Sequence, residues 1–192
     1  MTNLFIWVAH PRKESFCKAL ADAYEDGART AGVGISRQDL SNMQFSTAFE
    51  GYRAGQNELE PDLLAWQDNI SGADHLLFVF PYWWAAMPAR GKAVLDRALL
   101  PGFAFKYHDS GLGWDKLLKG KTGDAIITSD TPPWYDTLMF RKPSRNIIRN
   151  QVYGFCGIKS RKIVQMGSVK TATPERREKW LDQARALGAS LS

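Results

Sequence analysis

Cysteine and long apolar runs are both scarce in this chain of 192 residues. The two cysteines, Cys17 and Cys156, lie far apart in the sequence, which excludes a disulfide framework and the closely spaced ligand pairs of a zinc site. We therefore expect no metal centre. No stretch approaches the roughly 18 apolar residues of a membrane span, and the N-terminus lacks a secretory pattern. These absences predict a cytoplasmic protein with no integral membrane segment.

The chain also has only a small excess of positive charge, because its 25 basic and 20 acidic side chains leave a net charge of +5. Such a surplus suits nucleic acid, an acidic membrane surface or a phosphate-bearing cofactor. The cations gather in three short groups, in residues 12–13, 141–149 and 159–162. None of these groups carries the basic and aromatic pattern of an RNA-binding sheet or a helix-turn-helix signature. We therefore expect no nucleic-acid partner.

Strand-like and helical segments alternate along the chain, which at 44% hydrophobic residues is long enough for one well-buried core. Apolar runs predict strands at residues 4–9, 33–39, 75–80, 124–128 and 163–166. Helical spacing predicts helices at residues 16–24, 61–70, 88–99 and 174–187, with a further helix between 135 and 153. This alternation indicates a single α/β domain over residues 1–192, with a doubly wound parallel sheet covered on both faces. Two long connections, residues 42–60 and 100–121, have the length of functional loops.

In such a sheet the ligand lies beyond the carboxyl ends of the strands. The segment after the first strand, "HPRKESF", contains no glycine, which argues against a P-loop or a dinucleotide-binding fingerprint. His10, the Ser15 hydroxyl and the N–H groups of Phe16 and Cys17 at a helix N-terminus offer a site for one phosphate or a pyrophosphate. The alternative is an ordinary helix, capped by Ser15 and preceded by a solvated basic loop.

The segment after the third strand, "PYWWAAMPARGK", places three aromatic residues in a row. Tyr82, Trp83 and Trp84 cannot all face one core, because consecutive residues of an extended chain point in opposite directions. At least one of them is therefore expected to look into a cleft, where a planar aromatic ligand packs against the loop. A tryptophan-rich core or a dimer contact is the alternative.

The segment after the fourth strand, "TSDTPPWY", supplies hydroxyl and amide groups from Thr128, Ser129, Asp130 and Thr131. Tyr135 follows two prolines and is placed to donate a hydrogen bond to a ligand carbonyl that gains negative charge on reduction. The alternative for Tyr135 is a packing role.

Four segments together carry a family resemblance. "HPRKESF", "FPYWWAAMPARGKAVLDRAL", "GFAFKY" and "TSDTPPWY" resemble, in order and spacing, the flavodoxin-like NAD(P)H:quinone oxidoreductase family, and the stretch from "GFCGIK" to "ERREKWL" is similar to its bacterial members. The resemblance implies a flavodoxin-like five-stranded sheet of order 2-1-3-4-5 and a homodimer. It also implies a flavin cofactor, NADPH or NADH as hydride donor, and a quinone-like acceptor. In its spacing the opening loop resembles the quinone reductases more than the short-chain flavodoxins, which implies FAD as the flavin and leaves FMN as the alternative.

The resemblance also implies roles for individual residues. The flavin phosphate or pyrophosphate is expected to bind to His10, Ser15, Phe16 and Cys17. The isoalloxazine ring is expected to pack against the backbone of Pro81, Tyr82, Trp83, Trp84 and Ala85. The pyrimidine edge of the ring is expected to face Thr128, Ser129, Asp130 and Thr131. Tyr135 matches the catalytic tyrosine, and Phe105 and Tyr107 match aromatic residues that close over the substrate, usually from the partner subunit.

Three positions depart from the family. Ser129 and Asp130 stand where two glycines are frequent, and Arg141 stands where the mammalian enzymes have a histidine. Asp130 adds a negative charge near a ring that becomes anionic, whereas a cation at Arg141 would stabilise the reduced flavin. The predicted function is two-electron, ping-pong hydride transfer from NAD(P)H through flavin N5 to a quinone-like acceptor. The alternative is a flavin-bearing ancillary subunit of a bacterial potassium-efflux transporter, which would dock through residues 141–149.

Overall fold

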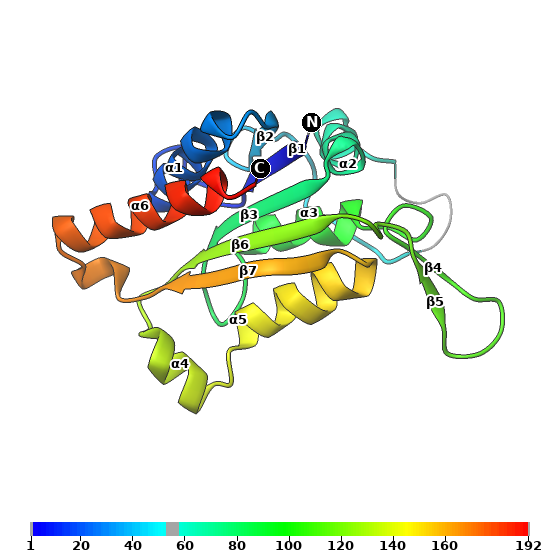
Figure 1. Cartoon of the computed structure of the whole chain (residues 1–192). Coiled ribbons are helices and arrows are strands. Elements are labelled where there is room, and N and C mark those ends of the chain that lie inside the picture. The colour runs from blue at the N-terminus through cyan, green and yellow to red at the C-terminus, as the bar shows by residue number, and fades with distance from the viewer. Residues whose placement is uncertain (1, 53–57, 192) are drawn as a thin grey trace.

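A parallel sheet of five strands forms the centre of the chain, whose computed structural model describes residues 2–52 and 58–191 (Figure 1). The strand order is β2-β1-β3-β6-β7, which is the predicted order 2-1-3-4-5. The five strands are β1 (Asn3–Val8), β2 (Gly34–Asp39), β3 (His75–Pro81), β6 (Thr122–Thr128) and β7 (Lys159–Met166). The predicted doubly wound flavodoxin-like fold is thereby confirmed.

Helices cover both faces of the sheet (Figure 1). One face packs against α1 (Phe16–Thr30) and α6 (Pro174–Ala189). The other packs against α2 (Pro61–Gly72), α3 (Ala89–Ala98) and a helix formed by α5 (Pro143–Asn146) and the π-helical η1 (Ile147–Gly154). Both faces of the central strands are therefore buried, which explains why their sequences are apolar without alternation. No helix in the described ranges is both long and apolar enough to cross a bilayer.

Two glycines let α1 and α6 approach closely. A Cβ atom at Gly188 would lie 2.0 Å from the carbonyl oxygen of Tyr24, and one at Gly27 would lie 1.9 Å from that of Arg185. No other residue fits at these distances, so the contact between the two helices depends on both glycines.

A buried polar cluster lies near the amino end of β6. The carboxylate of Asp124 accepts hydrogen bonds from the hydroxyl of Tyr24 at 2.7 Å and from the guanidinium of Arg161 at 2.5 Å. His75 contributes a ring nitrogen 3.5 Å from the same carboxylate and another 2.6 Å from the hydroxyl of Thr122. Arg161 also donates to the backbone carbonyls of Leu187 and Ser190, so the cluster joins the sheet to the end of α6.

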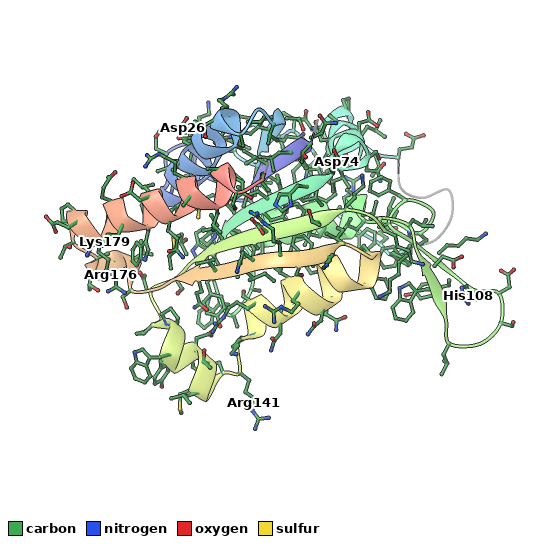
Figure 2. The ribbon with its side chains drawn as sticks, viewed as in Figure 1. Asp26, Asp74, His108, Arg141, Arg176 and Lys179 are labelled. Atoms are coloured by element: carbon green, nitrogen blue, oxygen red, sulfur yellow. The ribbon has the colours of Figure 1, made fainter. Side chains whose placement is uncertain are left out.

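The helix predicted between residues 135 and 153 is interrupted. The chain instead forms a short α4 (Pro133–Met139), turns at Arg141 and Lys142, whose φ values are 59° and 60°, and then enters α5. Arg141 projects into solvent at this turn (Figure 2). Two left-handed residues in succession end a helix. The sequence does not predict this break, because the residues that commonly adopt a left-handed conformation, glycine and asparagine, are absent from the two positions.

Two further differences concern strands. The connection 100–121 contains an antiparallel hairpin of β4 (Phe105–Tyr107) and β5 (Trp114–Lys116), where only a long loop was expected. The fifth strand of the sheet begins at Lys159 rather than at residue 163. Its first four residues are polar and lie at the sheet edge, where burial does not select apolar side chains.

Candidate functional site

The carboxyl ends of β1, β3 and β6 converge on a cleft of about 190 Å³. The loops after these strands supply most of its lining, and the turn after β7 adds one residue. The lining residues are His10, Arg12, Ser15, Phe16, Cys17, Pro81, Tyr82, Trp83, Thr128, Ser129, Asp130 and Val169. The structure thus brings together residues from all three segments that the sequence singled out, at the edge of the sheet where ligands of this fold class bind.

The N-terminus of α1 forms one end of the cleft. Ser15 is extended, with φ at −158°, and its hydroxyl oxygen accepts a hydrogen bond from the Lys18 amide at 3.2 Å. The hydroxyl proton remains available to a ligand. The amides of Phe16 and Cys17 lie in the first helical turn, where helix geometry provides no acceptor. These donors and the positive end of the helix dipole favour an anion at this position.

His10 lies at the same end of the cleft and is nearly buried, with 5% of its surface exposed. Its Nδ1 accepts a hydrogen bond from the Arg12 amide at 3.1 Å, so the neutral ring carries its proton on Nε2. Burial, together with the nearby Arg12 charge, lowers the pKa of His10. The ring is therefore neutral at pH 7 and offers one N–H donor.

The Cys17 thiol lines the cleft as a neutral group. Its sulfur lies 3.2 Å from the hydroxyl oxygen of Thr128, and burial raises its pKa to about 12. Burial likewise raises the pKa of Cys156 to about 11. Only thiolates are nucleophilic, so neither cysteine is suited to covalent or redox chemistry.

We therefore expect iodoacetamide at about pH 8 to label neither cysteine in the native protein, since both thiols stay protonated and buried. Intact mass after labelling measures this directly. The unfolded protein is the control and should take up two labels. One label on native Cys17 would contradict the geometry of the cleft.

The three consecutive aromatic residues diverge. Tyr82 points to Asp136, Trp83 lines the cleft with 45% of its surface exposed, and Trp84 is fully exposed. These two tryptophans are thus outside the hydrophobic core, so the core alternative is wrong for them. Trp83 and Ala86 exchange backbone hydrogen bonds of 2.9 and 3.0 Å.

We call residues 82–86 the tryptophan turn. The φ values of Trp84 and Ala85 within it are 50° and 63°, a left-handed conformation that costs residues with side chains about 1–3 kcal/mol each. Such strain is frequent where a backbone must be presented to a ligand.

The loop after β6 forms the opposite wall. The Ser129 hydroxyl donates to the carbonyl of Thr131 at 2.7 Å. The Asp130 carboxylate accepts the Lys170 amide at 2.9 Å, at the single turn η2 (Val169–Thr171). One carboxylate oxygen of Asp130 is therefore engaged by the protein.

Two lining residues were missed from the sequence. Arg12 belongs to the opening loop, where the sequence indicates only a positive charge. Val169 follows the fifth strand, in a loop for which the sequence predicts no role. Gly167 was the available signal, because a Cβ there would lie 2.5 Å from the carbonyl oxygen of Thr131. A glycine beyond a strand end often marks such a close approach of two loops.

Four predicted residues do not line the cleft: Trp84, Ala85, Thr131 and Tyr135. Tyr135 lies on α4 with 39% of its surface exposed, and its ring packs edge-on against Phe140, with centroids 5.6 Å apart. Within the described ranges its hydroxyl has no hydrogen-bond partner. That hydroxyl is consequently free to bind a ligand.

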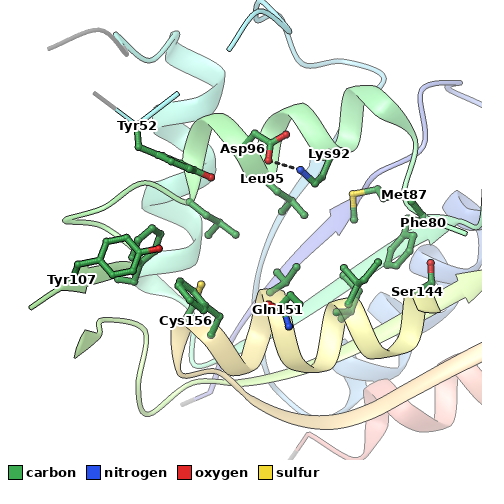
Figure 3. Close-up of a pocket in the computed structure, with 17 residues that line it drawn as sticks. Tyr52, Phe80, Met87, Lys92, Leu95, Asp96, Tyr107, Ser144, Gln151 and Cys156 are labelled. Carbon is green, nitrogen blue, oxygen red and sulfur yellow. Dashed lines mark hydrogen bonds and ion pairs between the residues drawn. The ribbon is translucent and has the colours of Figure 1, made fainter. Parts of the chain in front are cut away.

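Phe105 and Tyr107 do not line the cleft of their own chain. They line a second, mostly apolar pocket of about 330 Å³ between α3, η1 and the hairpin (Figure 3). The hairpin lies at the end of the sheet opposite α4 (Figure 1), and Figure 2 shows His108 on it, away from the helices. The described residues contain no group of three side chains able to hold a metal ion.

Comparisons with known proteins agree with the fold. Residues 1–187 match the flavodoxin-like fold family. A Haemophilus influenzae protein named as an uncharacterized NAD(P)H oxidoreductase is 30% identical, with 96% of this chain and 92% of that protein covered. The human ribosyldihydronicotinamide dehydrogenase [quinone] is 28% identical over 82% of this chain and 78% of its own.

A solved structure shares the same fold. The NAD(P)H:quinone oxidoreductase from Methanothermobacter marburgensis superposes with a TM-score of 0.83 at 22% identity, covering 100% of this chain and 99% of its own. The family match and the relatives confirm the resemblance noted in the sequence. The chain therefore belongs to the flavodoxin-like family that contains the NAD(P)H:quinone oxidoreductases.

Proposed function

We propose that this protein is a flavin-dependent NAD(P)H:quinone oxidoreductase. The observation that carries the proposal is the cleft itself, which combines anion donors, an exposed tryptophan wall and a loop of hydroxyl and amide groups at one sheet edge. NADH or NADPH would donate the hydride, and a quinone-like molecule would accept the electrons. A cytoplasmic location remains a prediction from the sequence.

The residues present fit a flavin nucleotide, FAD or FMN. His10 Nε2, the Ser15 hydroxyl and the first amides of α1 supply neutral donors for a phosphate, and Arg12 adds a positive charge. Trp83 and the backbone of the tryptophan turn would hold the ring, with residues 128–131 at its polar edge. A bound flavin would supply two-electron hydride chemistry at its N5 atom. The chain's own part is to bind and orient donor and acceptor in turn.

Tyr135 is the residue we assign to the chemical step. Its free hydroxyl would donate a hydrogen bond where negative charge develops, which stabilises a transition state more than a ground state. We expect Tyr135→Phe to keep its flavin and to be reduced by NAD(P)H roughly tenfold to a hundredfold more slowly.

Anaerobic stopped-flow of the loaded protein measures this rate through the visible absorbance of the flavin. Flavin content, measured on the same sample, serves as the control. A variant that is reduced at the wild-type rate would remove Tyr135 from the mechanism.

A homodimer would complete the acceptor site. Phe105 and Tyr107 lie away from their own cleft, and Tyr107 leaves 59% of its surface exposed. The apolar pocket beside them offers a surface for a second copy. Phe105 is only 5% exposed and packs in the core of its own chain. In this arrangement the partner's Tyr107, rather than the partner's Phe105, would close over the acceptor.

Steady-state turnover tests the proposed function. Rapid NAD(P)H-dependent reduction of a simple water-soluble quinone by the flavin-loaded protein is the expected result. Bound flavin with negligible turnover would instead support the ancillary-subunit alternative, in which residues 141–149 dock on a transporter.

A further inference from the structure

A second buried acidic residue lies directly beneath the cleft wall. The Asp136 side chain is 1% exposed and follows Tyr135 on α4. One of its oxygens accepts the Tyr82 hydroxyl at 2.7 Å, and the other accepts the Arg145 guanidinium at 3.0 Å. The carboxylate therefore joins three segments: the tryptophan turn, α4 and α5.

Other hydrogen bonds hold the same three segments together. Arg145 also donates to the Thr137 hydroxyl at 2.8 Å, which fixes the guanidinium against α4. The buried Ser144 hydroxyl donates to the carbonyl of Ala85 at 3.2 Å, at the left-handed end of the turn. The turn is thus attached at its first residue through Asp136 and near its end through Ser144.

The tryptophan turn needs such attachments. Trp84 and Ala85 are both left-handed, and Trp84 is fully exposed, so its side chain contributes no packing. A strained conformation persists only where the surroundings hold it. At the start of the turn the Tyr82 amide also donates to the Thr128 carbonyl at 2.7 Å, and the Trp83 ring packs edge-on against His10, with centroids 5.7 Å apart.

We propose that Asp136 is a positioning residue, whose carboxylate holds Tyr82 and so fixes the tryptophan turn as one wall of the cleft. Pro81, Tyr82 and Trp83 of this wall line the cleft, so a shift of the turn changes the cleft's width. The same carboxylate ties the wall to Tyr135, one residue earlier on α4. The effect on flavin binding rests on the proposed function, whereas the effect on the turn does not.

Tyr82→Phe is the sharpest test, because it removes one hydroxyl and leaves the pair of Asp136 and Arg145 intact. Loss of one hydrogen bond to a buried carboxylate should speed hydrogen exchange at the Trp83 and Ala86 amides about tenfold in flavin-free protein. It should also raise the dissociation constant of riboflavin 5′-phosphate about tenfold. The KM for NAD(P)H should rise with it, while kcat changes less.

Tyr24→Phe is the matched control. Its hydroxyl also donates to a buried carboxylate at 2.7 Å, but to Asp124, away from the cleft. This variant should lose stability without altering exchange in residues 83–86 or the affinity for riboflavin 5′-phosphate.

Two results would overturn the proposal. The first is wild-type exchange at both turn amides in Tyr82→Phe. The second is an equal loss of affinity in Tyr24→Phe, which would make the effect one of general stability. A wild-type protein that binds no flavin would refute the proposed function, and the exchange comparison would still decide the role of Asp136.

Discussion

Replacing Ser15 with aspartate is expected to weaken flavin binding at least about 100-fold while the fold is kept. Aspartate caps helices as well as serine does, so α1 should retain its N-terminal hydrogen bond to Lys18. Its carboxylate, however, would lie where the phosphate is proposed to bind. Two unit charges about 4 Å apart repel by about 4 kcal/mol at an effective dielectric constant near 20. Titration of the flavin-free protein with FMN or FAD, followed by fluorescence, measures the change.

Thr173→Asp provides the matched control for this experiment. Thr173 caps α6 in the same way, through a hydrogen bond from the Arg176 amide at 3.3 Å, and it does not line the cleft. This variant should bind flavin like the wild type. If Ser15→Asp also kept wild-type affinity, the phosphate would not lie at the start of α1.

Replacing Asp124 with asparagine is expected to lower the free energy of unfolding by about 3 kcal/mol at pH 7. The substitution leaves Arg161 without its carboxylate in a buried cluster, and breaking such a pair from one side is strongly destabilising. Urea denaturation measures the loss. Asp182→Asn is the control, because Asp182 pairs with Arg185 at the surface, where ion pairs contribute about 0–1 kcal/mol.

The pH dependence of this loss follows from the pKa of Asp124. Burial alone would raise that pKa, but the hydrogen bonds from His75 and Arg161 outweigh burial and lower it. A carboxyl whose pKa is lower in the folded state stabilises the fold above its unfolded pKa, about 3.9, and loses that contribution as the pH falls further. The difference between wild type and Asp124→Asn should therefore narrow below about pH 4. A constant difference down to about pH 2 would contradict the assignment.

The fold was predictable because burial on both sheet faces leaves a strong apolar pattern. Residues 75–80 are the clearest case, since β3 is buried along its whole length. The strand order came from the family resemblance rather than from this pattern. The start of the edge strand β7 and the hairpin β4–β5 were not predicted, because most of their side chains are only partly buried or exposed and therefore show no strong apolar pattern.

The candidate site was predictable where it follows strand ends. Parallel strands bring their carboxyl ends to one edge, so His10, Trp83 and Ser129 were expected to meet, and they line one cleft. Asp136 was not found, because a single acidic residue on a short helix carries no signal of burial. Its role depends on Tyr82 and Arg145, which only the folded chain brings into contact.

The visible absorption spectrum of the purified protein, with the released cofactor identified by mass, tests the central claim most directly. We predict a yellow protein that carries FAD or FMN at about one molecule per chain, or that takes it up on reconstitution. A colourless protein that binds neither FAD nor FMN would contradict the account.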